Sequence, residues 1–495
     1  MDVIMSVLTP ENLLLILAGV IIGNIFGCIP GLNAPIAVAL VLPITFSMAT
    51  LPAICLIMGL YMGSVSGGLV SAILLKIPGT AASVATTFDG YPMAQSGRAT
   101  EALSHGALAS VFGGIFSSIC LLLLAPFLSK MAIGFGPWEY FATATLSLVL
   151  VCVMLRGRVL KGFIAVCIGL LLKTVGSSPV DGVATRYTFG NYNLETGFNL
   201  IVVIIGVFAI PEIIYSIKNI HEKTKPMPVK KRLFYLPKFS SIKKNVNIMI
   251  RGSILGTFIG ILPGMGGGAA SLISYAQAKR TSKTPEKFGT GCEEGIYCCE
   301  SANNATTGGA LIPMLALGVP GDTVTAIIMG ALALQGLTPG PLFSMNNEVL
   351  FKSIIFSVFI ANILMFLYQI VTIRYMAKIT EVKKSYLYPW VTAFCITGVI
   401  SINNNLFDLL YLIVFGIIGY VLDKNDYPIA PFILSFVLGG IIEENLRRSI
   451  INHNTFMGAM QNVGFGTVFV VLAVLLPLFY AINYIRRERK SVHKA

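Results

Sequence analysis

Charged side chains are scarce in this sequence. Asp, Glu, Lys and Arg make up 12% of the 495 residues, whereas hydrophobic residues make up 55%. A soluble globular protein has roughly a quarter charged residues, and the mean hydropathy here is +0.81. Several apolar runs exceed the ~20 residues that a helix needs to cross a bilayer. The composition therefore excludes an ordinary soluble domain and predicts an all-α integral membrane protein.

The residues that metal and acid–base chemistry needs are also few. The chain has four His, and no His pair or Asp-rich motif lies in its apolar runs, which argues against an intramembrane enzyme acting on lipid-linked substrates. The spacing of Cys292, Cys298 and Cys299 fits no zinc or iron–sulfur pattern. No ATP-binding motif occurs, because no Lys-Ser/Thr follows the glycines at 266–268. No cofactor is expected, and no cleavable signal is evident at the start of the chain.

Basic residues collect in one segment that divides the chain. Residues 218–251 hold ten Lys or Arg and a single acid, so the positive-inside rule places this segment in the cytoplasm. The basic tail at 486–495 is expected on the same side. The predicted organisation is a first half at 1–217, a cytoplasmic linker at 218–250, a second half at 251–485 and the tail. Because the net charge of +13 arises in loops, nucleic-acid binding is not expected.

Glycine and proline interrupt the apolar segments at four places. Residues 12–28 and 34–50 meet at Pro30-Gly31, as a hairpin entering from outside or as two spans. A helix at 52–76 stops before Pro78-Gly79. Residues 252–278 turn at Pro263-Gly264, with arms of about a dozen residues that are too short to cross. A helix from about 296 is broken at Pro320-Gly321 and continues to Gln335. Further spans are predicted at 103–127, 133–155, 159–175, 198–217, 350–377, 388–402, 406–422, 428–442 and 463–484.

The interruptions form an internal repeat. The sequence at 27–31, GCIPG, matches GILPG at 260–264, and residues 67–79 match 309–321 with the same spacing between glycine and Pro-Gly. Five spans lie between the two hairpins, and an odd number inverts the second unit relative to the first. The sequence therefore predicts about 11–12 transmembrane helices in two inverted repeats, each with a re-entrant hairpin and a broken helix, as in ion-coupled carriers.

Breaks at bilayer depth are tolerated only where protein or a water-filled cavity covers them. A half-helix N-terminus suits a carboxylate, and the preceding carbonyl groups suit Na⁺. We therefore expect the tips and breaks to enclose one carboxylate and its coupling ions, Na⁺ or H⁺, and to move as an elevator. Alternatives are an N-cap role for Asp322, helix–helix hydrogen bonds for the amides, and proton transfer or orientation by Glu300. The candidate substrate- or ion-binding residues are Pro30, Gly31, Asn33, Pro78, Gly79, Thr80, Pro263, Gly264, Gly266, Asn303, Asn304, Thr306, Thr307, Pro320, Gly321, Asp322 and Thr323.

The chain resembles the large membrane subunit of the tripartite tricarboxylate transporters over nearly its whole length. The most specific stretches are GCIPGLNAPIAVALVLPITF, IPGTAASVATTFDGYPMAQSGRATEAL, GILPGMGGGAA and DYPIAPFILSFVLGGIIEENLRRS. The Pro-Glu-Ala-Ala-Asn-Asn signature of that family appears here at 299–304 as CESANN, without the proline.

The resemblance implies gradient-driven uptake of citrate-like or other organic carboxylates through a bacterial inner membrane. It also implies a small transmembrane subunit and a periplasmic solute-binding protein as partners. A stand-alone carboxylate symporter that needs no binding protein is the alternative.

Overall fold

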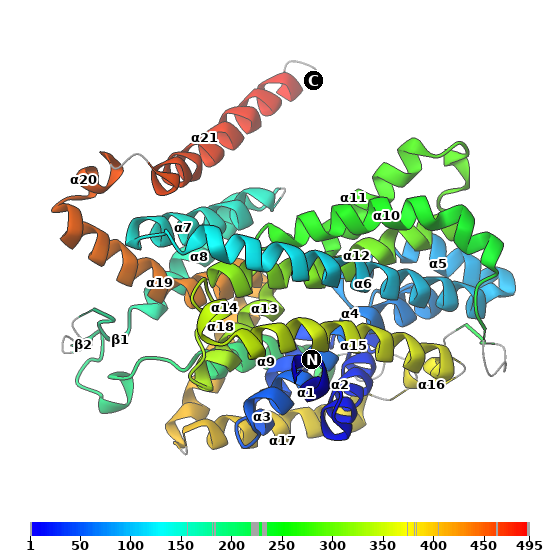
Figure 1. The fold of residues 1–495 in the computed structure, drawn as a ribbon, viewed down its shortest axis with the longest axis horizontal. Coiled ribbons are helices and arrows are strands. Elements are labelled where there is room, and N and C mark those ends of the chain that lie inside the picture. Colours follow the sequence, from blue (N-terminus) through cyan, green and yellow to red (C-terminus); the bar gives the residue numbers. More distant parts are fainter. Residues whose placement is uncertain are drawn as a thin grey trace.

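The computed structural model describes residues 2–155, 157–180, 182, 185–218, 227–229, 235–373, 375–380, 382, 384–403, 405–461 and 464–492. Over these residues the predicted all-α fold is confirmed (Figure 1), and the exception is a short antiparallel pair, β1 (Gly176–Ser177) and β2 (Thr185–Arg186). The end of the predicted tail, 493–495, lies outside the described residues, as do five of the predicted linker's basic residues, Lys223, Lys225, Lys230, Lys231 and Arg232.

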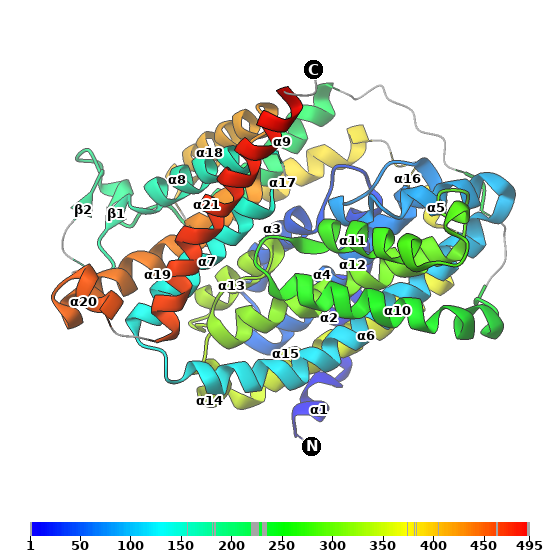
Figure 2. The same cartoon turned by 90° about the horizontal axis from the view of Figure 1, so that it is seen from above.

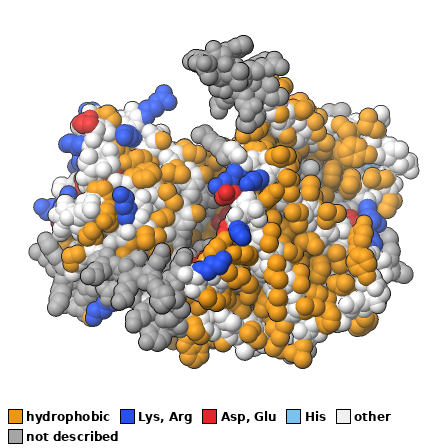
Figure 3. Space-filling model, turned by 180° about the vertical axis from the view of Figure 1, so that it is seen from behind, with side chains coloured by type: hydrophobic (Ala, Val, Ile, Leu, Met, Phe, Trp, Pro, Cys, Tyr) orange, Lys and Arg blue, Asp and Glu red, His pale blue; other side chains and the backbone are white. Residues whose placement is uncertain are grey.

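Eight helical stretches among the described residues are long and apolar enough to cross a membrane, by length and composition. They are α2 (Pro10–Cys28), α4 (Thr50–Leu75), Thr87–Ala132 with α5 (Thr87–Met93), η2 (Ala94–Arg98) and α6 (Ala99–Ala132), α7 (Pro137–Met154), α9 (Leu200–Lys218), α15 (Glu348–Thr372), α19 (Ile429–His453) and α21 (Phe465–Val492). Hydrophobic side chains cover much of the face in Figure 3, with charged ones in small groups. The chain is a multi-pass membrane protein.

The remaining helices are shorter or more polar. Those predicted as spans are α8 (Val159–Lys173), α17 (Lys384–Asn403) and α18 (Phe407–Lys424). The connecting elements are α1 (Asp2–Val7), η3 (Tyr192–Leu194), η4 (Pro285–Lys287), α14 (Phe343–Asn346), α16 (Met376–Thr380) and α20 (Phe456–Gln461).

All four predicted interruptions are present. The first hairpin consists of α2 and α3 (Ala34–Thr45), and the second of α10 (Phe239–Ile261) and α11 (Gly266–Thr281). The first broken helix is α4, followed by η1 (Ala81–Ser83) and α5; the second is α12 (Glu293–Leu317), followed by α13 (Thr323–Leu334). At the hairpin tips, Gly31 and Gly264 have φ 99° and 77°, which other residues avoid. Helices α4 and α12 end in left-handed C-caps at Lys76 and Gly318, just before prolines that have no N–H group.

Two boundaries were predicted wrongly. The first arm of the second hairpin has 23 residues rather than about a dozen, because α10 begins at Phe239 inside the predicted linker. Lys243 and Lys244 are exposed there while Met249 is buried, so these two lysines lie on the polar face of an amphipathic helix. The helix predicted at 103–127 begins earlier, at Ala99, and belongs to a continuous helical stretch from Thr87 whose bend is at Gly97, with φ 80°.

The long helices form two groups that lie side by side (Figure 2). The central group contains α2, α4, α6, α10, α11, α12 and α15, which pack on one another, and the flanking group contains α7, α8, α9, α17, α18, α19 and α21. Helices α3 and α13 connect them, because α3 packs on α9 and α17 while α13 packs on α9 and α19. The hairpins and breaks therefore lie in the central group and along its border with the flanking group.

Candidate functional site

The first helices of the two hairpins pack on the broken helices in the same way. A Cβ atom built on Gly67 would lie 3.0 Å from the Cα atom of Gly27, and one built on Gly309 would lie 3.1 Å from the Cα atom of Gly260. Close-packed helices leave no room for such atoms, so only glycine fits at these crossings. The glycines that match in sequence thus make matching backbone contacts, α2 with α4 and α10 with α12.

The two Pro-Gly breaks are held by their own hairpins. A Cβ atom on Gly79 would collide with the carbonyl oxygen of Gly27, and one on Gly321 would lie 2.6 Å from that of Gly260. At the second tip, the N–H of Gly264 donates to the carbonyl oxygen of Gly321 at 2.8 Å. Each break therefore rests on the backbone of the preceding hairpin, and Pro263, Pro320 and their glycines lie together.

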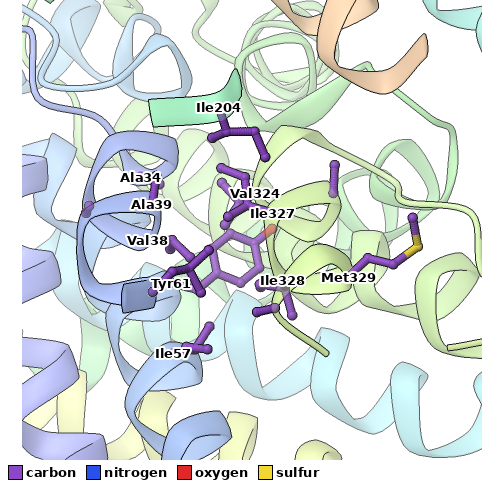
Figure 4. Close-up of a cluster of buried hydrophobic side chains, with 14 of the residues drawn as sticks. Ala34, Val38, Ala39, Ile57, Tyr61, Ile204, Val324, Ile327, Ile328 and Met329 are labelled. Atoms are coloured by element: carbon purple, nitrogen blue, oxygen red, sulfur yellow. The ribbon is translucent and has the colours of Figure 1, made fainter. Parts of the chain in front are cut away.

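Each hairpin also covers the break of the other unit. Helix α11 packs on η1, where the Ser271 hydroxyl donates to the carbonyl oxygen of Ala82 at 2.8 Å. Helix α3 packs on α13 through aliphatic side chains, among them Val38 and Ile327 (Figure 4). The structure thus brings η1, whose N-cap is Thr80, to the second hairpin, and it brings α3 to the helix that follows the second break.

Asp322 caps the second break. Its Oδ1 atom accepts from the N–H of Thr325 at 2.7 Å and its Oδ2 atom accepts from the Tyr61 hydroxyl at 2.7 Å. This carboxylate occupies the helix N-terminus where an anion would otherwise bind. The neighbouring Thr323 is the first residue of α13. Of the two roles considered for Asp322, the structure places the side chain in the N-cap position.

The first break shares one bond of this plan, from the N–H of its N-cap residue to the hydroxyl three residues later, but the Thr80 side chain is uncharged and caps no N–H group among the described residues. The N–H of Thr80 donates to Ser83 Oγ at 3.3 Å, and that hydroxyl donates to the carbonyl oxygen of Thr80 at 2.9 Å. Opposite lies the start of α11, where Gly266 has φ 57° and a Cβ atom on it would meet nothing within 4 Å. Gly267 and Gly268 approach Ala82 and Ala81. An uncharged cap, a glycine-lined helix start and open space therefore meet here.

Glu300 is the centre of a buried polar cluster on α12. Its Oε1 atom accepts from Thr86 Oγ1 at 2.5 Å, and its Oε2 atom accepts from Ser110 Oγ at 3.3 Å. The Nδ2 atoms of Asn303 and Asn304 lie 3.3 and 3.4 Å from Oε2. The carboxylate therefore fixes both amide groups with their nitrogens toward it, which is the orienting role considered for Glu300.

The four amide and hydroxyl candidates on α12 face different neighbours. Asn303 Oδ1 and Thr306 Oγ1 lie 2.5 and 3.3 Å from where a Cβ atom of Gly267 would be, beside the first break. Asn304 Nδ2 donates to Ser110 of α6 at 2.8 Å, and Thr307 Oγ1 lies 3.3 Å from the sulfur of Met62 in α4. Asn303 and Thr306 therefore lie beside the first break, whereas Asn304 and Thr307 contact adjoining helices.

The first hairpin tip faces the flanking group. Gly31, with φ 99°, lies against the Glu212 carboxylate of α9, which also accepts from the Tyr388 hydroxyl at 2.9 Å. Asn33 caps α3 by accepting from the N–H of Ile36 at 3.2 Å. These contacts give Gly31 and its neighbour Pro30 a position at the border of the two groups.

Sequence reasoning missed Asp89. This buried residue of α5 accepts from three backbone N–H groups, those of Gly289, Gly291 and Cys292, each at 2.9 Å, and from the Tyr275 hydroxyl at 2.9 Å. Asp89 therefore ties the helix after the first break to α11 and to the segment leading into α12. The only sequence signal was an acid inside an apolar, glycine-rich stretch.

Comparison with known proteins identifies the family. The model for the tripartite tricarboxylate transporter TctA family matches residues 13–434. The chain belongs to the TctA family. It is therefore a membrane component of a transporter family, and the match includes both hairpins and both breaks.

Two relatives from Agrobacterium vitis support membership of the TctA family. An uncharacterized 52.8 kDa protein in the TAR-I ttuC' 3'region is 38% identical over 446 residues, which cover 90% of this chain and 88% of the relative. An uncharacterized protein in the TAR-II ttuC' 3'region is 41% identical over 227 residues, which cover 44% of this chain and 94% of the relative. No solved structure matches the chain.

Metal ligands of the usual kind are not clustered. Among the described residues, no group of three or more His, Cys, Asp or Glu could hold a metal ion. The polar groups at the two breaks are amides, hydroxyls, backbone groups and the separate carboxyl groups of Glu300 and Asp322.

Proposed function

We propose that this protein is the large membrane subunit of an uptake system for tricarboxylates or related organic carboxylates, driven by an Na⁺ or H⁺ gradient. Its partners would be a small transmembrane subunit and a periplasmic solute-binding protein, and its location the bacterial inner membrane with the C-terminus in the cytoplasm. The observation that carries the proposal is the pair of hairpin and broken-helix units with matching backbone contacts. Such units, inverted relative to each other, form the solute site of many secondary carriers.

The solute carboxylate would bind at the first break. The second break already carries the Asp322 carboxylate on the start of α13, and a second anion there would be repelled. At the first break the cap is the uncharged Thr80, and the start of α11 presents backbone N–H groups around Gly266 and Gly267. Helix N-termini favour anions through these groups and the helix dipole.

Transport would follow an elevator movement of the central group against the flanking group. The contact between α3 and α13 consists mainly of aliphatic side chains (Figure 4), whose packing is non-directional. One long hydrogen bond crosses it at the end of both helices, from the Gln335 amide to the carbonyl oxygen of Thr45 at 3.4 Å. A cavity of about 400 Å³ lies at the border, between Gly318 and Met329 on one side and Tyr140 and Asn445 on the other. Both features support movement along this border.

Reconstitution tests the proposal. Vesicles containing this chain and the small subunit should accumulate radiolabelled citrate or another di- or tricarboxylate under an ion gradient when the binding protein is supplied. Accumulation without the binding protein would favour a stand-alone symporter. No carboxylate accumulation with all three components and any cation gradient would refute the proposed function.

A further inference from the structure

Asn303 presents a buried oxygen atom that lacks a partner. The side chain is fully buried, and its Oδ1 atom accepts no hydrogen bond from the described residues. The orientation of the amide is fixed, since rotating it would turn Oδ1 onto the Glu300 carboxylate. A buried acceptor without a partner costs free energy, so this oxygen points to a ligand.

Glu300 holds the Asn303 amide in this orientation. Its carboxyl group is fully buried, and every hydrogen bond it makes within the described chain comes from a neutral hydroxyl or amide. A buried carboxylate is costly unless a charge of opposite sign lies near it, and a cation bound beside this cluster would supply that charge.

The surroundings of the Asn303 oxygen suit a small hard cation. Thr306 Oγ1 lies beside it, because both oxygens lie within 3.3 Å of where a Cβ atom of Gly267 would be. The neighbouring Gly266, at the start of α11, has open space over it. Neutral amide and hydroxyl oxygens are ligands of hard cations rather than of zinc or copper. A cation here would also lie next to the expected carboxylate of the solute.

We propose that Na⁺ binds at this point, with Asn303 Oδ1 as a direct ligand and Thr306 Oγ1 beside it. Glu300 is a positioning residue that orients the amide. This inference rests on the proposed ion-driven uptake and deepens it, because it assigns the coupling ion to Na⁺ instead of a proton carried by Glu300.

The test measures Na⁺ on the purified full-length chain, without transport. Binding of radioactive sodium and thermal unfolding in NaCl against choline chloride are compared for wild type and variants. Wild type should bind Na⁺ and be stabilised by it. Glu300→Gln should weaken Na⁺ binding by about 10–100-fold, as is usual for residues that orient a metal ligand. Asn303→Leu should abolish binding, whereas Asn303→Asp should retain it.

Two more variants separate the site from folding. Gly267→Ala should also abolish Na⁺ binding, because the new methyl group would lie 2.5 Å from Asn303 Oδ1. Asn362→Ala is the matched control, since Asn362 Oδ1 is likewise buried without a partner among the described residues but is covered by Gly114. This control should bind Na⁺ as wild type does.

The results distinguish this inference from the proposed function. The Na⁺ site is overturned if the folded wild-type protein neither binds Na⁺ nor is stabilised by it. It is also overturned if the Glu300→Gln variant binds Na⁺ with unchanged affinity. Carboxylate uptake driven by a pH gradient in sodium-free buffer also overturns it and leaves the uptake function standing. Sodium binding that follows the expected pattern, in a chain that takes up no carboxylate, supports the site and counts against the function.

Discussion

Asp322 and Thr80 occupy corresponding positions after the two breaks, yet only one of them is charged. The charge on Asp322 is held by three donors, the N–H and hydroxyl of Thr325 and the hydroxyl of Tyr61. Thr80, the N-cap residue of η1, has an uncharged side chain, and its backbone N–H donates to Ser83 Oγ. The two breaks therefore make similar backbone contacts, but the side chain at the N-cap is charged at one and uncharged at the other.

Substitution of Asp322 separates capping from charge. Asp322→Ala removes the N-cap of α13 and should lower the free energy of unfolding by about 0.5–2 kcal/mol, as well as abolish carboxylate uptake without preventing membrane insertion. Asp322→Asn keeps a capping oxygen and should recover most of that stability. Urea titration and uptake in vesicles measure the two effects. Wild-type uptake by Asp322→Ala would remove this residue from the site.

Asn304 is tested by truncation. Asn304→Ala removes the donor to Ser110 Oγ and one donor to Glu300, so the buried carboxylate loses part of its support. Uptake should be abolished while the protein still inserts. Ser110→Ala is the control. It removes the hydroxyl that lies between Asn304 and Glu300, and it leaves the amides of Asn303 and Asn304 donating to Glu300. Full uptake by Asn304→Ala would show that the amide only joins helices.

Glycine crossings determine how close the broken helices lie to the hairpins. Gly309→Ala would place a methyl group 2.5 Å from the carbonyl oxygen of Thr257 and should lower the melting temperature, since overpacking costs about 1–3 kcal/mol. Gly134→Ala is the matched control, because a Cβ atom there would meet nothing within 4 Å. Equal melting temperatures for the two variants would contradict the close crossing of α10 and α12.

Asp89 joins three elements through one carboxylate. Asp89→Ala would remove three hydrogen bonds from the N–H groups of Gly289, Gly291 and Cys292, each worth about 0.5–1.5 kcal/mol. We expect this variant to fold poorly in a fluorescence size-exclusion assay. Tyr275→Phe removes only the hydroxyl donor and should fold with a small loss. A well-folded Asp89→Ala protein would contradict the role of this carboxylate in joining α5 to α11 and α12.

Local sequence signals predicted the helix breaks, but contacts between residues far apart in the sequence could not be predicted from them. Pro78 and Pro320 end helices through their own backbone chemistry, so the breaks appeared at the predicted positions. The start of α10 was missed because exposed lysines of an amphipathic helix resemble a loop in composition. The partners of Asp89 lie about 200 residues away in the chain, and the direction of the Asn303 amide depends on a carboxylate whose packing the sequence did not reveal.

At the scale of the whole molecule, the border between the two groups is where movement is proposed. A Cβ atom built on Gly398 of α17 would lie 3.3 Å from Cβ of Pro43 in α3, close to the ~3.8 Å of a disulfide. The double variant Pro43→Cys with Gly398→Cys should lose uptake on oxidation and regain it on reduction, because the bond joins the first hairpin to the flanking group.

A bond inside the flanking group is the control. Cβ of Lys173 lies 3.2 Å from where a Cβ atom of Gly439 would be, so Lys173→Cys with Gly439→Cys should also cross-link, but without an effect on uptake. The single variants guard against reactions of the nine native cysteines. Full uptake by the oxidised Pro43–Gly398 pair would mean that the groups do not move relative to each other at α3.

The unequal caps also bear on stoichiometry. The two helix breaks offer two similar binding positions, and with uncharged residues at both N-caps the chain could bind two solute molecules. Because the Asp322 carboxylate already occupies one of these positions, we expect a single solute molecule per polypeptide in each cycle.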